Sequence, residues 1–316
     1  MPEPATRRPL VLAAVALVVL IAVAGAVVVG RGLGRDAGPS TGATAPVTPR
    51  PSSSSTSSPT PSAAPAPTTS AAVPTPSAAP VPPSGPLTLV GLGDSVPAAT
   101  TCGCTSFVDL LGSRLEALTG HSWVVHNDSH DAWTTANVEA DLATPATRQH
   151  LAAADLVVLE VGANDVDLDK VPDPTCFPAA ASGCYADTLS ALGASLTSIV
   201  GQIRALDHRP DLRIALLGYW NVTVDGQVGQ QRGDDFVVGS DDLTKEVNAT
   251  IEQVAVSTRA VYVDAYTPLK GASGTRDPTG DLLADGDHLD ASGHARMAAT
   301  IVTRLERDGA LPGWGG

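Results

Sequence analysis

Short aliphatic runs alternate with longer segments of mixed polarity along the last 230 or so residues of the chain. Runs of four to six mostly aliphatic residues are typical of strands that are buried on both faces of a sheet. They occupy residues 87–92, 123–126, 156–161, 213–217 and 260–263. This pattern predicts a central, mostly parallel sheet of five strands.

The segments between these runs carry apolar side chains at three- and four-residue spacing, which predicts amphipathic helices. The predicted helices are 106–118, 135–153, 187–206, 241–258 and 292–307, the last with Ser292 as its N-cap. Strands that alternate with helices form a parallel sheet covered on both faces. We therefore expect an α/β fold, a three-layer α/β/α sandwich, in one domain over residues 87–316.

A second kind of apolar pattern lies near the N-terminus. Twenty consecutive uncharged residues, 10–29, would span ~30 Å as a helix, which is the thickness of a hydrocarbon core. Arg7 and Arg8 precede this run and favour a cytoplasmic N-terminus over residues 1–9. We expect residues 10–30 to anchor the protein in the cell membrane by a single pass; a cleaved signal peptide, which would give a secreted protein, is the alternative.

Composition sets apart the segment that follows. Of the 48 residues from 39 to 86, 42 are Pro, Ser, Thr or Ala, and these residue types cannot build a core. Residues 31–86 are therefore predicted to be a disordered linker, semi-extended because of its proline content. Either form of the N-terminus would leave the folded domain outside the cytoplasm.

The acidic charge is confined to the folded domain. The whole chain has a formal net charge of −14, whereas residues 87–316 hold 14 basic and 31 acidic groups and carry −17. Binding to a polyanion requires a cationic surface, so we expect no nucleic-acid partner.

All four cysteines, Cys102, Cys104, Cys176 and Cys184, fall in the predicted domain. An even number of cysteines in an exported chain predicts disulfides. Cys176 and Cys184 flank a short loop, and their pairing would leave Cys102 with Cys104; the alternative links the two loops to each other. The spacing of a zinc site is missing, so we expect no metal.

Two loops of the predicted domain hold groups suited to acyl transfer. In an open α/β sheet the ligand site lies outside the carboxyl ends of the strands. Ser95 follows the first predicted strand, while Asp285 and His288 share the loop before the last helix. A serine hydroxyl attacks an acyl carbon when a histidine takes its proton and a carboxylate orients the ring. We therefore expect Ser95 as nucleophile, His288 as general base and acid, and Asp285 as the orienting carboxylate.

The attack places negative charge on the carbonyl oxygen, which needs preorganised donors. Three candidates are the backbone N–H of Ser95, a backbone N–H in the loop after the second strand, and the side-chain amide of Asn164, which follows the third strand.

The order of these motifs resembles the SGNH (GDSL-type) hydrolase family. The matching motifs are Gly-Asp-Ser at 93–95, Gly-x-Asn-Asp at 162–165 and Asp-x-x-His at 285–288, and the resemblance covers nearly all of the predicted domain. It implies the flavodoxin-like SGNH hydrolase fold and hydrolysis of carboxylic esters by Ser95, His288 and Asp285 through an acyl-enzyme, without a cofactor. It also implies that Asn164 is an oxyanion donor.

One motif departs from the family pattern. Asn127 and the pair Thr134-Thr135 match its second block, which places Ala132 where the family has its oxyanion glycine. A backbone N–H survives this change, but a positive φ would cost a non-glycine residue ~1 kcal/mol.

The resemblance implies an esterase or lipase whose substrate is a small-molecule, lipid or acylated-glycan ester. Two alternatives stay open: an acyltransferase to a cell-envelope glycan, and a catalytically weak binding module on the same fold. We expect a monomer.

Several neighbouring residues have more than one interpretation. Tyr219 and Trp220 follow the fourth strand and either cover the sheet edge or form a wall of the substrate pocket, and Trp133 has the same two alternatives. His126 and His130 are expected to make loop hydrogen bonds rather than to bind a metal. Asp165 is expected to brace the turn of Asn164.

Overall fold

The structure is a computed structural model that describes residues 85–207, 209 and 211–311. The predicted cytoplasmic N-terminus, the anchor or signal segment at 10–30 and nearly all of the linker at 31–86 lie outside the described residues. The last five residues of the predicted domain also lie outside them.

A parallel sheet of five strands forms the centre of the domain. The strands are β1 (Leu87–Gly93), β2 (Trp123–Asn127), β3 (Leu156–Glu160), β4 (Arg213–Leu217) and β5 (Val261–Val263). They are ordered β2-β1-β3-β4-β5, and every neighbouring pair is parallel. The predicted strands are confirmed, with ends that differ by one residue at most. β1 and β3 are wholly buried, which agrees with their continuous aliphatic sequences.

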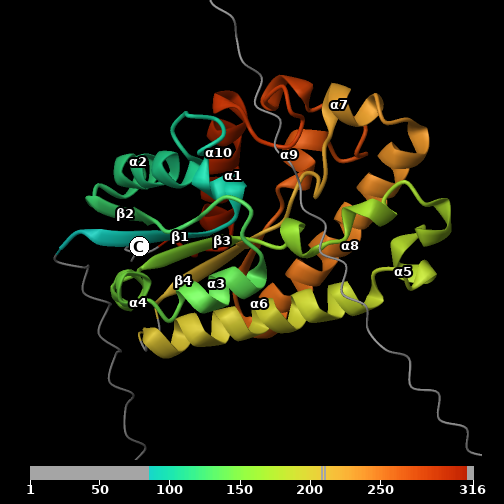
Figure 1. The fold of residues 1–316 in the computed structure, drawn as a ribbon. Coiled ribbons are helices and arrows are strands. Elements are labelled where there is room, and N and C mark those ends of the chain that lie inside the picture. The colour runs from blue at the N-terminus through green and yellow to red at the C-terminus, as the bar shows by residue number, and fades with distance from the viewer. Residues whose placement is uncertain (1–84, 208, 210, 312–316) are drawn as a thin grey trace, which may run out of the picture. The chain divides into compact units, whose positions relative to one another are not determined.

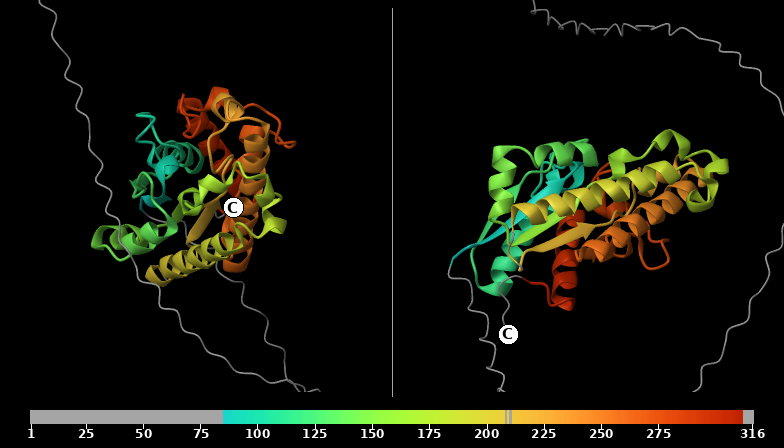
Figure 2. Two further views of the ribbon diagram at one scale, coloured as in Figure 1. Left: turned by 45° about the vertical axis from the view of Figure 1, so that its right-hand side comes forward. Right: turned by 90° about the horizontal axis from the view of Figure 1, so that it is seen from below.

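Helices cover both faces of this sheet, so the predicted three-layer α/β/α sandwich is confirmed (Figures 1 and 2). The helices α3, α4, α6 and α8 pack on one face, and α1, α2, α9 and α10 on the other. The bounds of the helices are α1 (Ser95–Ala98), α2 (Phe107–Thr119), α3 (Thr135–Asp141), α4 (Pro145–Ala152), α5 (Ala179–Ser182), α6 (Ala186–Leu206), α7 (Gly226–Gln230), α8 (Asp234–Thr258), α9 (Tyr266–Lys270) and α10 (Ala291–Arg307).

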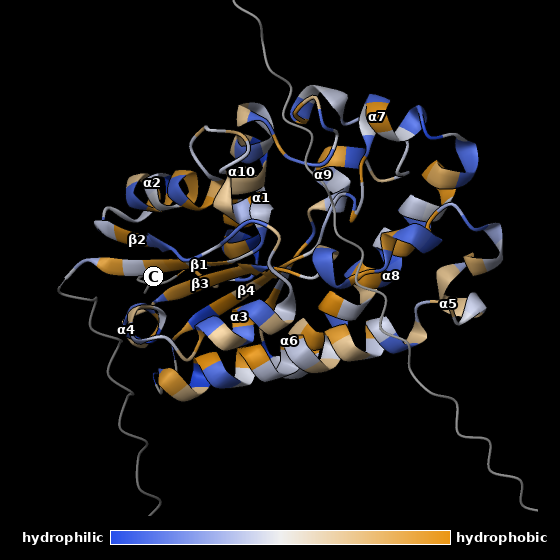
Figure 3. Ribbon diagram, in the orientation of Figure 1, coloured by the Kyte–Doolittle hydropathy of each residue, from blue (hydrophilic) through white to orange (hydrophobic). Residues whose placement is uncertain are grey.

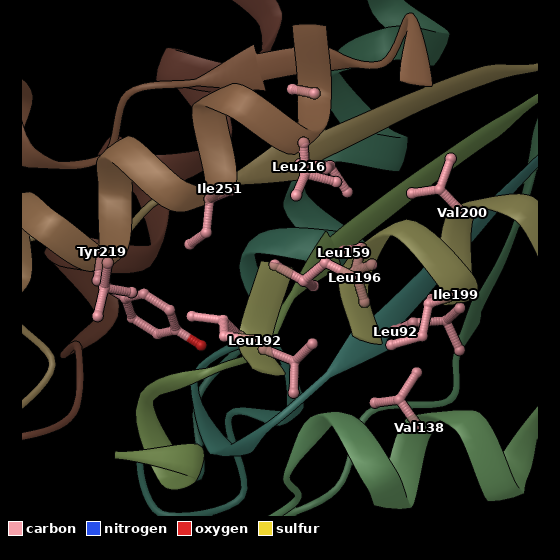
Figure 4. Close-up of a cluster of buried hydrophobic side chains, with 14 of the residues drawn as sticks. Leu92, Val138, Leu159, Leu192, Leu196, Ile199, Val200, Leu216, Tyr219 and Ile251 are labelled. Carbon is pink, nitrogen blue, oxygen red and sulfur yellow. The ribbon is translucent and has the colours of Figure 1, made fainter. Parts of the chain in front are cut away.

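Two hydrophobic clusters, one on each face of the sheet, form the core. Figure 3 shows the hydrophobic strands in the centre, while the helices carry alternating hydrophobic and hydrophilic residues. Figure 4 shows part of the first cluster, in which Leu92 and Leu159 of the sheet meet Leu196 and Ile199 of α6. Each of these helices buries one apolar stripe against a face of the sheet. The three- and four-residue spacing of apolar residues in the sequence predicted these contacts.

Three predicted helix boundaries were wrong. The segment 135–153 forms two helices instead of one, because Pro145 cannot continue a helix and begins α4 with Thr144 as its N-cap. The helix predicted to begin at 241 begins at Asp234, seven residues earlier. The N-cap of α10 is Asp290 rather than Ser292: its carboxylate accepts the N–H groups of Ser292 and Gly293.

Within the described part of the chain, one helix, α6, is long and apolar enough to cross a membrane by length and composition. Its side chains Leu192, Leu196, Ile199, Val200 and Ile203 are buried in the first core cluster. Packing within the domain therefore accounts for the apolar character of α6.

Two disulfides close short loops in the domain. Cys102 pairs with Cys104, and Cys176 pairs with Cys184. The predicted pairing is therefore the one found, and the alternative that links the two loops is not.

Candidate active site

The turn after β1 presents Ser95 at the carboxyl end of the sheet. Gly93 has φ +149°, and a Cβ there would lie 2.0 Å from the carbonyl oxygen of Glu160, so only glycine fits. Asp94 caps α1 by accepting the N–H of Val96 at 3.0 Å. Ser95 is the first residue of α1 and is partly exposed. Its backbone N–H, in the first turn of a helix, has no partner within the helix and is free for a ligand.

The loop before α10 holds His288 and Asp285 in a fixed pair. Nδ1 of His288 lies 2.9 Å from Oδ2 of Asp285. The other carboxylate oxygen of Asp285 accepts the backbone N–H groups of Asp287 at 2.9 Å and His288 at 3.1 Å. Burial by itself would raise the pKa of Asp285, but these hydrogen bonds and the nearby imidazole hold it below its ordinary value. Asp285 therefore remains ionised and fixes both the ring and the loop backbone.

A contact from outside the loop sets its position. Gly286 has φ +73°, and its carbonyl accepts the N–H of Asp225 at 2.7 Å. A Cβ on Gly286 would lie 2.8 Å from the carbonyl oxygen of Asp225, so the close approach requires glycine. Asp225, which sequence reasoning did not single out, therefore anchors the loop that carries His288.

The loop before α10 and the Ser95 turn lie within electrostatic range of each other. Burial is the main cause of the raised pKa of Asp94, the residue before Ser95; the charge of Asp287 raises this pKa further, and that of His288 lowers it. No hydrogen bond joins Ser95 Oγ to His288 among the residues that the structure describes. In structures without a substrate such catalytic hydrogen bonds are often long.

The loop after β2 lies beside the third motif. Ala132 has φ +59°, a left-handed backbone conformation that favours glycine. The amide of Asn164 donates from Nδ2 to the carbonyl of Trp133 at 2.9 Å, which leaves its second N–H for another acceptor. The carboxylate of Asp165 was expected to brace the turn of Asn164; among the described residues it instead accepts the backbone N–H of Thr135 at 3.0 Å and its hydroxyl at 2.6 Å. The loops after β2 and β3 are thus tied together.

The positive φ of Ala132 makes a testable difference to stability. Replacing Ala132 with Gly removes a left-handed strain of ~1–2 kcal/mol at an entropic cost of ~0.5–1 kcal/mol. We therefore expect Ala132→Gly to raise the free energy of unfolding in urea by ~0.5–1 kcal/mol. Ala153, also exposed but with φ −104°, is the matched control, and Ala153→Gly should lower stability. Equal losses in the free energy of unfolding of both variants would contradict the prediction that the backbone at Ala132 is strained.

Three ionisable side chains are buried behind the Ser95 turn. Asp94, Glu160 and Tyr219 are each 1% exposed. Burial raises the pKa of Asp94 from 3.8 to about 7, although hydrogen bonds from Tyr219 and Val96 lower it. Burial, and then the charge of Asp94, raises the pKa of Glu160 well above its ordinary value. Neither carboxylate oxygen of Glu160 has a hydrogen-bond partner within the described residues.

This burial predicts that Asp94 and Glu160 destabilise the folded domain increasingly as the pH rises. A carboxyl whose pKa is raised by folding binds its proton more tightly in the folded state, so its penalty grows from about pH 4 upward. For Asp94 this penalty levels off above about pH 7, the pKa of the group in the folded state. Glu160→Gln should therefore stabilise the domain at pH 8 and change it little at pH 4.5, as measured by urea unfolding. Glu116→Gln, on the exposed side of α2, is the control; a gain independent of pH would contradict the prediction.

The other residues singled out in the sequence have different surroundings. Tyr219 and Trp220 are 1% and 0% exposed, so neither is a wall of an open pocket. Trp133 is partly exposed and stacks on the exposed His130, with ring centroids 4.2 Å apart. His126 stacks on His150 at 3.7 Å, and Nδ1 of His150 lies 2.8 Å from Asp128.

One possible metal group occurs among the described residues. The ligand atoms of Cys102, Cys104 and His294 lie within 4.8 Å of one another. Both sulfurs belong to the Cys102–Cys104 disulfide, and Nδ1 of the buried His294 accepts the N–H of Phe107 at 3.3 Å. These residues serve the structure of the loop before α2.

A three-layer α/β/α fold with a serine after the first strand and an aspartate–histidine pair in the last loop has the parts of an ester hydrolase. The comparisons with known proteins agree. Residues 92–296 match the GDSL-like Lipase/Acylhydrolase family, and the chain belongs to this family. It is a carboxylic ester hydrolase.

Solved structures share the fold at low sequence identity. A lipase, Lip_vut3, from a goat rumen metagenome is 16% identical with a TM-score of 0.56, and the match covers 69% of this chain and 97% of that one. A catalytic mutant of the acetylxylan esterase Axe2 from Geobacillus stearothermophilus is 18% identical with a TM-score of 0.50, covering 71% and 96%. A search of curated protein sequences found no match.

Proposed function

We propose that the protein is an extracytoplasmic serine esterase that acts as a monomer through an acyl-enzyme. The observation that carries this proposal is the 2.9 Å contact between His288 Nδ1 and Asp285 Oδ2, in a loop within electrostatic range of the Ser95 turn. This contact leaves Nε2 of His288 as the nitrogen that can accept a proton.

The proposed reaction has two halves. Ser95 Oγ attacks the ester carbonyl carbon while its proton passes to Nε2 of His288. The carbon–oxygen bond to the alcohol then breaks, and the alcohol leaves with the proton from His288. Water then attacks the acyl carbon and gives a proton to Nε2 of His288. The bond between the acyl carbon and Ser95 Oγ breaks, Ser95 Oγ takes the proton back from His288, and the carboxylic acid leaves.

Three donors are proposed to receive the negative charge that develops on the carbonyl oxygen. They are the backbone N–H groups of Ser95 and Ala132 and the free N–H of the Asn164 amide. The contact of Asn164 with Trp133 O supports this assignment, because it holds the amide beside Ala132. The stack of the exposed His130 on the partly exposed Trp133 lies at the same loop and is available to contact the substrate.

The N-terminal sequence supports a location outside the cytoplasm. The apolar run at 10–29 and the proline-rich segment after it are suited to hold a catalytic domain at a distance from a membrane. Esters of small molecules, membrane lipids and acylated glycans would all be accessible there.

Labelling with a fluorophosphonate probe tests the proposed function. The probe phosphonylates a serine that a histidine activates, with loss of fluoride. We expect one adduct, on the peptide that contains Ser95, when the intact protein is digested and analysed by mass spectrometry. A protein that stays unlabelled and hydrolyses no ester would instead be a binding module. Products formed with a glycan acceptor present separate hydrolysis from acyl transfer.

A further inference from the structure

Tyr219 lies where it can link the two halves of the candidate site. Its ring belongs to the first core cluster, and Figure 4 shows its hydroxyl oxygen pointing toward the interior of that cluster. Its backbone is held from α8, because the Asn248 side chain accepts the N–H of Tyr219 at 2.7 Å and donates to its carbonyl at 2.7 Å. The position of Tyr219 is therefore fixed twice, by the hydrogen bonds to its backbone and by the packing of its ring.

The hydroxyl of Tyr219 makes two hydrogen bonds to different turns. It donates to Oδ2 of Asp94 at 2.5 Å, and it accepts the backbone N–H of Ala163 at 3.4 Å. Asp94 immediately precedes Ser95, and Ala163 immediately precedes Asn164. A single oxygen atom thus connects the turn that carries the candidate nucleophile with the turn that carries a candidate oxyanion donor.

We propose that Tyr219 is a positioning residue that holds Ser95 and Asn164 in the relative placement that acyl transfer requires. This inference rests on the proposed function of Ser95. Misplacing a reacting group by about 1 Å can cost ~100-fold in rate even when the substrate still binds.

The charges around Asp94 explain why its carboxylate needs the hydrogen bond that the hydroxyl of Tyr219 donates. Asp94 faces Glu160 from β3, Asp287 and His288 from the loop before α10, and Tyr219. Its oxygen Oδ1 accepts only the N–H of Val96 among the described residues, and Oδ2 accepts the phenol. Without the phenol, Oδ2 would lose the one hydrogen bond that it has within the described part of the chain. Asp94 would then shift or take up a proton, and either change would alter the start of α1 at Ser95.

A matched pair of phenylalanine substitutions tests the proposal. We expect Tyr219→Phe to lower kcat for a p-nitrophenyl ester by ~10–100-fold and to leave KM within about twofold. The rate at which the fluorophosphonate labels Ser95 should fall by a similar factor. The control is Tyr185→Phe: Tyr185 is also wholly buried, but its hydroxyl has no hydrogen-bond partner among the described residues, so kcat should not change.

The outcomes separate this role from a purely structural one. If Tyr219→Phe lowers the unfolding midpoint but keeps the kcat and labelling rate of the unchanged protein, Tyr219 is structural and the proposal is wrong. If Tyr219→Phe does not fold, Asn248→Asp, which loses the donation to Tyr219 O, should lower kcat in the same way, and an unchanged kcat would overturn the proposal. If the unchanged protein is never labelled at Ser95, the proposed function itself fails.

Discussion

Replacing Ser95 with Ala is expected to lower kcat/KM for a short p-nitrophenyl ester by ~10⁴-fold or more, because no acyl-enzyme can form without the hydroxyl. The residual rate would come from binding and the oxyanion donors alone. The fluorophosphonate adduct should disappear in the same variant.

The fold should survive this change. Ser95 is partly exposed, and its hydroxyl makes no hydrogen bond within the described residues, so we expect the free energy of unfolding to change by no more than ~0.5 kcal/mol. Ser113→Ala is the control, since Ser113 is an exposed serine on α2 whose hydroxyl donates, within the described part of the chain, only to the carbonyl of Asp109. Its activity should equal that of the unchanged protein, and full activity in Ser95→Ala would refute the assigned nucleophile.

The sheet could be predicted from the sequence because a strand that is buried on both faces has a nearly continuous run of aliphatic residues. In β3, each of the residues Leu156–Glu160 is buried, and all but the last are aliphatic. The break between α3 and α4 was missed although Thr144 and Pro145 signal it, because the apolar spacing continues through both helices.

The candidate site was predictable only where its residues form local motifs. Asp285 and His288 lie three residues apart and make contact through one short loop. Tyr219 and Asp94 are separated by 125 residues, and their hydrogen bond depends on the sheet order that brings β1, β3 and β4 together. Glu160 at the end of β3 could have been noticed as a charged residue in a buried strand, but the sequence does not show that Asp94 and Tyr219 lie beside it.

The same limit applies to Lys270, which supports the loop before α10 through Asp225. Lys270 is 4% exposed, and its Nζ lies 2.8 Å from Asp225 Oδ2 and 3.3 Å from Asp241 Oδ1. Asp225 also donates its backbone N–H to Gly286 O at 2.7 Å. The ion pair therefore fixes the residue on which the loop of Asp285 and His288 rests.

We expect Lys270→Met to be the most destabilising of the substitutions considered, with a loss of ~3–5 kcal/mol in the free energy of unfolding. The loss arises because Met removes the cation and leaves the carboxylate of Asp225 buried without it. Urea unfolding at pH 7.5 measures it. Lys245→Met is the matched control: Lys245 pairs with the same Asp241 at 2.6 Å, but its side chain is 56% exposed, so we expect a cost below ~1 kcal/mol.

A double variant separates the buried charge from the loss of packing. Asp225→Asn removes the charge that Lys270→Met leaves behind, while the Asp225 backbone N–H to Gly286 is kept. If the uncompensated charge is the main cost, Lys270→Met with Asp225→Asn should be more stable than Lys270→Met alone. If the loss of stability in the double variant instead equals the sum of the two single losses, the two side chains act independently and the buried pair does not hold the loop before α10.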